Sequence, residues 1–173
     1  MTIKGYIYMN KDTIKLQNFI LEEFDDSKKD HWQLKRELIQ NEDSYLISRD
    51  IDNFIKRNNA LHQQDNITNT FSIIYDGIYI GIAFLNYHPE EIREGIVFEE
   101  EIEIGLGLLP VFRDKHLGSL FEREFCEYLL EKYPQFNEVV ARIENDNTRS
   151  IKAPNYVGFE HINGDEYHFK RKI

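Results

Sequence analysis

The stretch that decides the fold reads Glu103-Ile-Gly-Leu-Gly-Leu-Leu-Pro-Val-Phe-Arg-Asp-Lys-His-Leu-Gly-Ser-Leu-Phe121. Its apolar run, residues 104–109, predicts a buried strand that ends at Pro110, because proline cannot continue a strand ladder. From Leu117 onward apolar residues recur at helical spacing, which predicts a helix over 116–132. These residues are Leu117, Leu120, Phe121, Phe125, Tyr128 and Leu129.

The turn between this strand and this helix carries the cations Arg113, Lys115 and His116. Gly118 and Ser119 are small enough to allow close backbone approach. Backbone N–H groups at a helix N-terminus, with cations beside them, suit a phosphorylated ligand. The stretch is neither a Walker P-loop, which ends in Gly-Lys-Ser/Thr, nor a dinucleotide fingerprint, which needs glycine where Pro110 stands. The turn by itself leaves open an ordinary strand–turn–helix with solvated cations.

Two motifs resemble the GNAT family of N-acetyltransferases. Residues 110–119, Pro-Val-Phe-Arg-Asp-Lys-His-Leu-Gly-Ser, resemble its acetyl-CoA signature, Pro-x-x-Arg/Gln-x-x-Gly-x-Gly/Ala. Arg113 and Gly118 fit this signature, and His116 replaces its first glycine. Residues 147–160, Asn-Thr-Arg-Ser-Ile-Lys-Ala-Pro-Asn-Tyr-Val-Gly-Phe-Glu, resemble the family's Asn-x-x-Ala/Ser…Tyr-x-x-x-Gly-Phe block. The two motifs occur in the family's order, and the resemblance covers residues 69–173.

The resemblance implies a mixed α+β fold with a central mixed, mostly antiparallel sheet flanked by helices. The expected order of elements is β-α-α-β-β-β-α-β-α-β-β. We expect a single acetyltransferase domain over residues 1–173, in which 69–173 carry the cofactor-binding sheet and helices. Residues 1–68 are expected to be a helical part that lines the substrate cleft. The alternative is that this part only covers the sheet.

Local patterns predict the individual elements. We expect strands over 3–9, 71–75, 78–87, 96–109, 139–143, 159–162 and 167–171. We expect helices from residue 12 or 13 to 24, and over 32–39, 51–61, 116–132 and 147–155. Residues 88–95 predict a loop, and Asp76-Gly77 and Asn163-Gly164 predict primed hairpin turns.

The family resemblance also assigns cofactor-binding residues. Backbone amides of the turn would bind the pyrophosphate of acetyl-CoA, with Arg113 and Lys115 adding charge. The turn residues are Asp114, Lys115, His116, Leu117, Gly118 and Ser119. Leu106, Leu108 and Leu109 lie where the strand backbone would pair with the pantetheine arm and one N–H would polarise the thioester carbonyl. His116 is expected to be helical already, so that its side chain costs little where the family has glycine.

Residues 147–156 carry the last assignments that the resemblance implies. Asn147 matches an asparagine that contacts coenzyme A, and a helix N-cap is the alternative role for it. The family's tyrosine, which protonates the departing thiolate, aligns with Pro154, which has no proton to give. Tyr156 lies about 200° further round a helix, so that it would not simply replace it. The general acid is therefore not identified.

Three carboxylates, Glu99, Glu101 and Glu103, alternate along the strand that precedes the turn. We predict that Glu103 is catalytic, either accepting the amine proton through water or binding a cationic substrate. A solvated strand face is the alternative. The histidines have no metal-ligand spacing, so no metal site is predicted.

Composition narrows the class of protein further. The 173 residues carry a formal net charge of −10 with a pI near 5.1, which disfavours nucleic-acid binding. The acidity favours a small-molecule amine or a basic peptide as the partner, and solubility is the alternative reason for it. No apolar run is long enough to span a membrane. Cys126 is the single cysteine, which excludes an internal disulfide and indicates a cytoplasmic protein.

We therefore predict an N-acetyltransferase that moves an acetyl group from acetyl-CoA to a primary amine by direct attack. A non-catalytic domain that senses acyl-CoA is the first alternative, and a structural or partner-binding module is the second. The identity of the amine, and whether the protein is a monomer or a homodimer, stay open.

Overall fold

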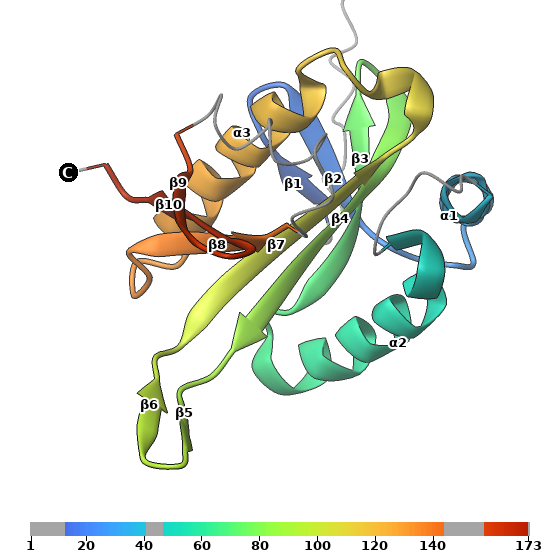
Figure 1. The fold of residues 1–173 in the computed structure, drawn as a ribbon. Helices are drawn as coiled ribbons and strands as arrows, with labels where there is room; N and C mark the ends of the chain where they lie inside the picture. The colour runs from blue at the N-terminus through green and yellow to red at the C-terminus, as the bar shows by residue number, and fades with distance from the viewer. Residues whose placement is uncertain (1–12, 41–46, 144–157, 173) are drawn as a thin grey trace, which may run out of the picture.

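A central eight-stranded sheet organises the protein, in the strand order β1-β2-β3-β4-β7-β8-β10-β9. The structure, a computed structural model, describes residues 13–40, 47–143 and 158–172. Within these residues β7 and β8 run parallel, and the other neighbours in the sheet pair antiparallel. Helices α1 and α2 cover one face of the sheet and α3 covers the other (Figure 1). This arrangement confirms the predicted mixed α+β class with a mostly antiparallel sheet.

The elements have the following bounds. The strands of the central sheet are β1 (Thr13–Lys15), β2 (Phe19–Glu23), β3 (Asn69–Tyr75), β4 (Ile78–His88), β7 (Glu101–Leu108), β8 (Glu138–Arg142), β9 (Glu160–Asn163) and β10 (Glu166–Lys170). A separate hairpin consists of β5 (Glu91–Arg93) and β6 (Ile96–Phe98). The helices are α1 (Lys29–Ile39), α2 (Ile47–Asp65) and α3 (Leu117–Lys132), and a 3-10 turn covers Pro110–Phe112.

The helix predicted from residue 12 or 13 to 24 is wrong, because this segment forms the β1–β2 hairpin. Along β2 the exposure alternates as in a strand: Phe19 and Leu21 are buried, whereas Ile20 is exposed. Every residue of β2 pairs with β3, from Phe19↔Tyr75 to Glu23↔Phe71. The apolar spacing of this segment suits a helix, but pairing with the distant strand β3 determines its structure. The strand predicted over 3–9 and the helix predicted over 147–155 lie outside the described residues.

The helices predicted over 32–39 and 51–61 are confirmed as α1 and α2. A series of hydrogen bonds between largely buried polar groups attaches α1 to the sheet. The Asp25 N–H donates to His31 Nδ1 at 3.0 Å, and His31 Nε2 lies 3.0 Å from a carboxylate oxygen of Glu22. The hydroxyl of Tyr79 on β4 donates to the same carboxylate at 3.1 Å, and burial beside Glu22 raises the pKa of Tyr79 to about 12. His31 is completely buried, so this series of hydrogen bonds fixes its position against β2 and β4.

The hairpin predicted at Asp76-Gly77 is confirmed, since β3 and β4 flank these two residues and both have positive φ angles, 49° and 75°. Residues 88–95 are not only a loop. They contain β5, and the strand expected over 96–109 is divided into β6 and β7. The last hairpin turns at residues 164–165, one position later than predicted, because Asn163 still pairs with Glu166.

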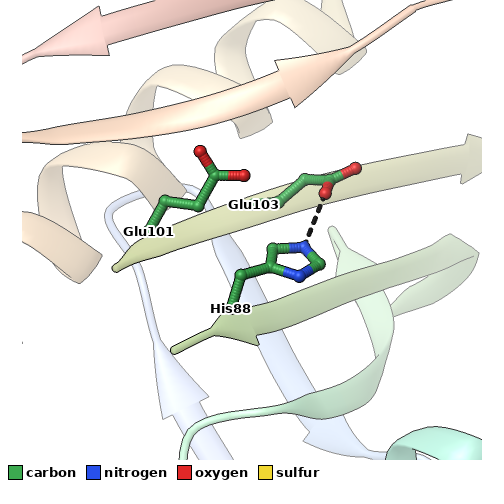
Figure 2. Close-up of side chains that lie close together, drawn as sticks. All are labelled: His88, Glu101 and Glu103. Carbon is green, nitrogen blue, oxygen red and sulfur yellow. Dashed lines mark hydrogen bonds and ion pairs between the residues drawn. The ribbon is translucent and has the colours of Figure 1, made fainter. Parts of the chain in front are cut away.

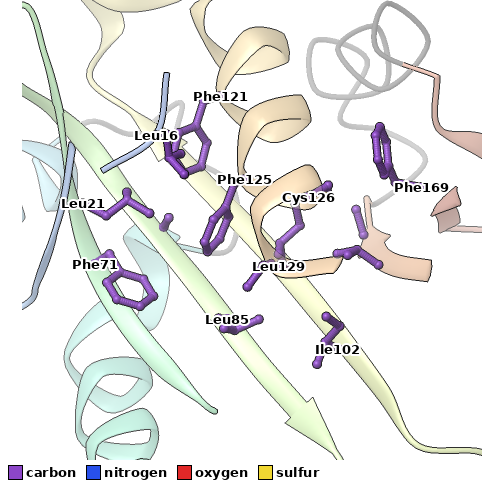
Figure 3. Close-up of a cluster of buried hydrophobic side chains, with 14 of the residues drawn as sticks. Leu16, Leu21, Phe71, Leu85, Ile102, Phe121, Phe125, Cys126, Leu129 and Phe169 are labelled. Carbon is purple, nitrogen blue, oxygen red and sulfur yellow. The ribbon is translucent and has the colours of Figure 1, made fainter. Parts of the chain in front are cut away.

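The core has two parts, one on each face of the sheet. On one face, Phe121, Phe125 and Leu129 of α3 pack on buried residues of β2, β3, β4 and β7 (Figure 3). On the opposite face Ile51 and Ile55 of α2 pack with Ile82 and Phe84 of β4 and with Leu109. No helix within the described residues is both long and apolar enough to cross a membrane.

Candidate active site

Strands β7 and β8 pair over two positions, Glu103↔Val140 and Ile104↔Ala141. Strand β7 continues to Leu108, so its last four residues extend past this pairing. Its other edge stays paired with β4 over the whole length, down to Gly81↔Leu108. Within the described residues, therefore, the sheet opens between β7 and β8 from residue 105 onward.

The backbone of β7 shows which groups face this opening. The Leu109 N–H donates to Ile80 O of β4 at 2.8 Å, and Leu109 O accepts from the Phe112 N–H. Because N–H groups alternate between the two edges of a strand, those of Leu108 and Leu106 point to the side of β8. Of the three leucines expected to pair with the pantetheine arm, Leu106 and Leu108 are therefore placed to do so. The backbone N–H and C=O of Leu109 both make hydrogen bonds within the protein.

The turn that follows leads into α3 as expected, but the prediction that His116 is helical is wrong. His116 and Asp114 both have φ 58°, in the left-handed region. His116 is the N-cap residue of α3, outside the helix proper, and its side chain makes no capping hydrogen bond. The family's glycine at this position is therefore replaced by a residue that must take a positive φ, which costs about 1 kcal/mol or more.

Arg113 and Gly118 connect this turn to the end of β7. Arg113 Nε donates to Leu108 O at 3.0 Å, on the edge of β7 that faces the opening. A Cβ added to Gly118 would lie 3.4 Å from Leu106 and 3.6 Å from Leu108 side-chain atoms. The first turn of α3 therefore packs directly over the open edge, with Leu117 half-buried and Ser119 buried beside it. Asp114, Lys115 and His116 are exposed.

Glu103 lies on the face of the sheet that α2 covers further along, since Glu103 and Gly105 pair with Asn86 and Phe84 of β4. One of its carboxylate oxygens lies 2.8 Å from His88 Nε2 and 2.9 Å from Arg142 Nη1 (Figure 2 shows the histidine contact). Arg142 also reaches Glu101 at 2.7 Å and Glu166 at 3.5 Å. These five residues, from β4, β7, β8 and β10, form what we call the carboxylate–histidine cluster.

Hydrogen bonding sets the charge of Glu103. Burial raises the pKa of this carboxyl group, but the hydrogen bond from His88 and the charge of Arg142 lower it by more, so its pKa lies below the ordinary value. Glu103 is therefore an ionised carboxylate at neutral pH and a weak proton acceptor. The exposed His88 ring contacts this carboxylate through Nε2, so its Nδ1 lies on the other side of the ring.

The cluster includes three residues whose ligand atoms all lie within 4.8 Å of one another: His88, Glu101 and Glu103 (Figure 2). Spacing along the sequence did not predict this proximity. The guanidinium of Arg142 neutralises both carboxylates from the same side, with N–O distances of 2.7 Å and 2.9 Å. A bound cation would have to compete with it, and the prediction that the protein uses no metal stays a prediction.

Sequence reasoning missed His88 and Arg142. The signal for His88 was the register of the β4–β7 pair, which places it opposite Glu101. The sequence does not fix this register through a tight turn, because the β5–β6 hairpin lies between β4 and β7 along the chain. Asn147, Pro154 and Tyr156, to which roles were given above, lie outside the described residues.

The N-terminal part of the chain contributes a separate cavity of about 550 Å³ between β2 and α2. Four carboxylates line it, those of Glu22, Glu23, Asp25 and Asp26. None of the expected cofactor-binding residues that the structure describes lies in its wall. The expectation that residues 1–68 line the substrate cleft stays a prediction.

Comparison with known proteins identifies the family. A family model described as an acetyltransferase (GNAT) domain matches residues 19–160. An acetyltransferase from Agrobacterium tumefaciens superposes with a TM-score of 0.69 at 13% identity, covering 95% of this chain and 98% of that chain. A Salmonella typhimurium acetyltransferase that modifies the N-terminal serine of ribosomal protein L7/L12 gives 0.62 at 17% identity, with coverages of 90% and 96%.

An aminoglycoside acetyltransferase, AAC(6′)-Ib, in complex with coenzyme A, gives a TM-score of 0.66 at 17% identity, with coverages of 89% and 94%. At such identities these likenesses show the fold. No curated protein is similar enough to count as a match. Since the family model spans most of the chain, including β2 to β8, the turn and α3, the chain belongs to the GNAT family and is an acetyl-CoA-dependent N-acetyltransferase.

Proposed function

We propose that this N-acetyltransferase acts on a primary amine that carries a positive charge in solution, and that the reaction takes place where β7 leaves β8. The observation that carries the proposal is the position of the carboxylate–histidine cluster. It includes Glu103, at which β7 still pairs with β8, and the open edge starts two residues later. Acetyl-CoA and the acceptor amine would therefore meet along the same strand, β7.

The open edge suits acetyl-CoA in three respects. The N–H groups of Leu106 and Leu108, which point to the side of β8, would pair with an extended pantetheine arm, and one of them would polarise the thioester carbonyl. The N-terminus of α3 lies at the end of this edge, and the N–H groups of its first turn would bind a pyrophosphate. Arg113, already anchored on Leu108 O, adds a cation there. Asp114, Lys115, His116, Leu117, Gly118 and Ser119 stay the proposed pyrophosphate loop, and Asn147 a proposed contact.

The acceptor amine would approach over Gly105 and Gly107. These residues lie on the same face of β7 as Glu103 and leave that face without side chains. The amine must lose its proton before it attacks the thioester. We assign this step to the imidazole of His88, directly or through water, while Glu103 orients the ring and stabilises the imidazolium that forms. The role proposed for Glu103 from sequence thus becomes that of the anionic partner.

The charge around the cluster favours a cation. Glu101, Glu103 and Glu166 surround the guanidinium of Arg142, and the whole protein carries a net charge of −10. Related folds act on a protein N-terminus and bind aminoglycosides, which are amines that are cationic at neutral pH. We therefore expect a protein N-terminus, a polyamine or an aminoglycoside as acceptor, with weaker binding as salt is added.

The experiment that tests this function is an acetylation assay with acetyl-CoA and a panel of amines, followed by mass spectrometry. The panel contains peptides with free N-termini, polyamines and aminoglycosides, together with neutral hydroxylamine-like controls of similar size. A cationic amine should be acetylated fastest, and its KM should rise with ionic strength. If acetyl-CoA stabilises the protein but no amine is acetylated, the acyl-CoA sensor becomes the better interpretation.

Gly118→Glu is expected to abolish the binding of acetyl-CoA. The new side chain would start 3.4 Å from Leu106, over the open edge of β7, and would bring a negative charge to the pyrophosphate loop. At a hundredfold excess over the Kd, acetyl-CoA should stabilise the parent protein by about 2.7 kcal/mol. The measurement is the shift in melting temperature on adding acetyl-CoA.

Arg123→Gln is the matched control, because it changes the net charge by the same amount on an exposed position of the same helix. This variant should keep most of the shift. An undiminished shift in Gly118→Glu would contradict the placement of the cofactor at α3.

A further inference from the structure

Glu122 is a buried carboxyl group on α3 that the reaction described above does not use. It is only 9% exposed, and its buried Oε2 atom has no hydrogen-bond partner among the residues that the structure describes. A buried carboxyl oxygen with no partner costs free energy, so it needs an explanation.

The position of Glu122 follows from the helix geometry. It comes four residues after Gly118 and four before Cys126, so the three share one face of α3. Gly118 packs on Leu106 and Leu108 of β7, and Phe121, Phe125 and Cys126 project from α3 into the core (Figure 3). Side chains of a helix lean toward its N-terminus, so we expect the Glu122 side chain to lean toward the turn that covers the open edge.

The surroundings of Glu122 on the sheet are apolar. The residues of β7 and β8 that face α3 are Ile102, Ile104, Leu106, Leu108, Val139 and Ala141. Cys126 is the titratable neighbour on the helix, and the charges of Glu122 and Glu127 add to the effect of burial in raising its thiol pKa. Burial is also what raises the pKa of Glu122, to about 8. At neutral pH Glu122 is therefore mostly a protonated acid that can give up a proton.

The transfer step needs such a group. When the amine nitrogen bonds to the thioester carbon, the carbon–sulfur bond breaks and its electron pair goes to sulfur. A proton delivered to that sulfur prevents the reverse reaction. His88 and Glu103 lie on the opposite face of the sheet and take the proton of the amine. A donor on the α3 side of the β7–β8 opening would complete the reaction.

Resting on the proposed function, we propose that Glu122 is the general acid that protonates the departing thiolate of coenzyme A, directly or through one water. The carboxyl proton moves to sulfur, giving the free thiol of coenzyme A, and the resulting carboxylate is reprotonated from solvent. The amine proton leaves separately through His88. This assignment accounts for a carboxyl group that is buried at a cost, and it supplies the acid that Pro154 cannot.

A first test measures the protonation state without any turnover. Because the folded-state pKa of Glu122 lies above its ordinary value of 4.5, folding is penalised increasingly as pH rises from about 4.5 to about 8. Glu122→Gln removes this penalty. Its gain in melting temperature over the parent should therefore grow across that range and then level off. A gain in melting temperature that does not change with pH would overturn the proposal, since Glu122 would then not carry a proton at neutral pH.

The decisive test varies the leaving group. Glu122→Gln should lower kcat with acetyl-CoA about a hundredfold, within the range for loss of a general acid. With acetyl seleno-coenzyme A, whose selenolate leaves without a proton, the loss should shrink to a few-fold. Glu127→Gln, on the exposed face of the same helix, is the matched control and should behave as the parent with both donors.

The outcomes separate this proposal from the proposed function. An equal loss with both donors, or no loss with acetyl-CoA, overturns the role of Glu122 while the enzyme remains an acetyltransferase. If the parent protein transfers acetyl from neither donor to any amine, the proposed function fails first, and the role of Glu122 fails with it.

Discussion

Glu103→Gln is expected to lower kcat about a hundredfold, with a smaller effect on KM. Glutamine keeps the shape of the side chain but removes the charge that lies 2.8 Å from His88 Nε2. The imidazolium that forms as the amine loses its proton would then have no anionic partner. The magnitude follows from the range found for general acid–base groups.

Two variants sharpen this prediction. His88→Gln should cause a similar loss, and the double variant should lose little more than either single one, because residues that act as a unit are not additive. Glu101→Gln is the matched control, since Glu101 contacts the same Arg142 but has no hydrogen bond to His88 among the described contacts. A rise in KM with unchanged kcat would assign Glu103 to binding of the cation instead. Unchanged constants over the whole pH range would mean that the carboxylate–histidine cluster is a solvated face.

The same residue predicts a pH dependence of stability. The folded-state pKa of Glu103 lies below its ordinary value of 4.5, so the stabilisation by this carboxylate is present above that pH. It should be lost as pH falls below about 4.5 through the folded-state pKa. The difference in melting temperature between the parent and Glu103→Gln should therefore narrow in acid. A difference that stays constant would contradict the interaction of the Glu103 carboxylate with His88 and Arg142.

Gly81→Val is expected to destabilise the fold by about 3 kcal/mol, at the upper end of the range for overpacking. A Cβ at this position would lie 2.2 Å from the backbone oxygen of Gly107 and 2.9 Å from Leu108 Cδ2. The backbone cannot move away without breaking the pairing of β4 with β7, including the bond from the Leu109 N–H to Ile80 O. For a protein of this size the melting temperature should fall by roughly 6–12 °C.

Gly105→Val is the matched control for this variant, because a Cβ there would meet Phe84 at an ordinary distance of 3.5 Å. Both glycines lie in the paired region of β4 and β7, so strand propensity affects them alike. Equal melting temperatures for the two variants would contradict the argument from close approach. A larger loss in Gly81→Val would show that the close approach of β4 to β7 at Gly81 helps to hold the strand of the proposed cofactor edge in place.

The local elements of the site could be predicted from the sequence. The apolar run before Pro110 and the helical spacing after Leu117 define the strand, the turn and the helix, because each is decided within a few residues. The Asp76-Gly77 hairpin is likewise local, since the two turn residues accept the positive φ that the turn requires. These elements, with the two motifs around them, were enough to predict the class of fold and the family.

Interactions between distant residues decided the rest. Residues 13–24 have apolar spacing that suits a helix, yet pairing with β3 makes them a hairpin, and β3 lies about fifty residues away. Asp114 and His116 take a left-handed backbone because the turn must bring α3 over the end of β7. Residue type alone does not impose this conformation.

The chemistry of the site also depends on tertiary structure. The meeting of His88 with Glu103 depends on the register of β4 and β7, and the arrival of Arg142 depends on the parallel pairing of β8. The raised pKa of Glu122 requires the burial that α3 acquires only when it packs on the sheet. By itself the sequence determined which groups the protein has and the local shape of each segment. Only tertiary packing decided which groups meet and which lose water, because charge and proton affinity depend on neighbours that the chain brings together by folding.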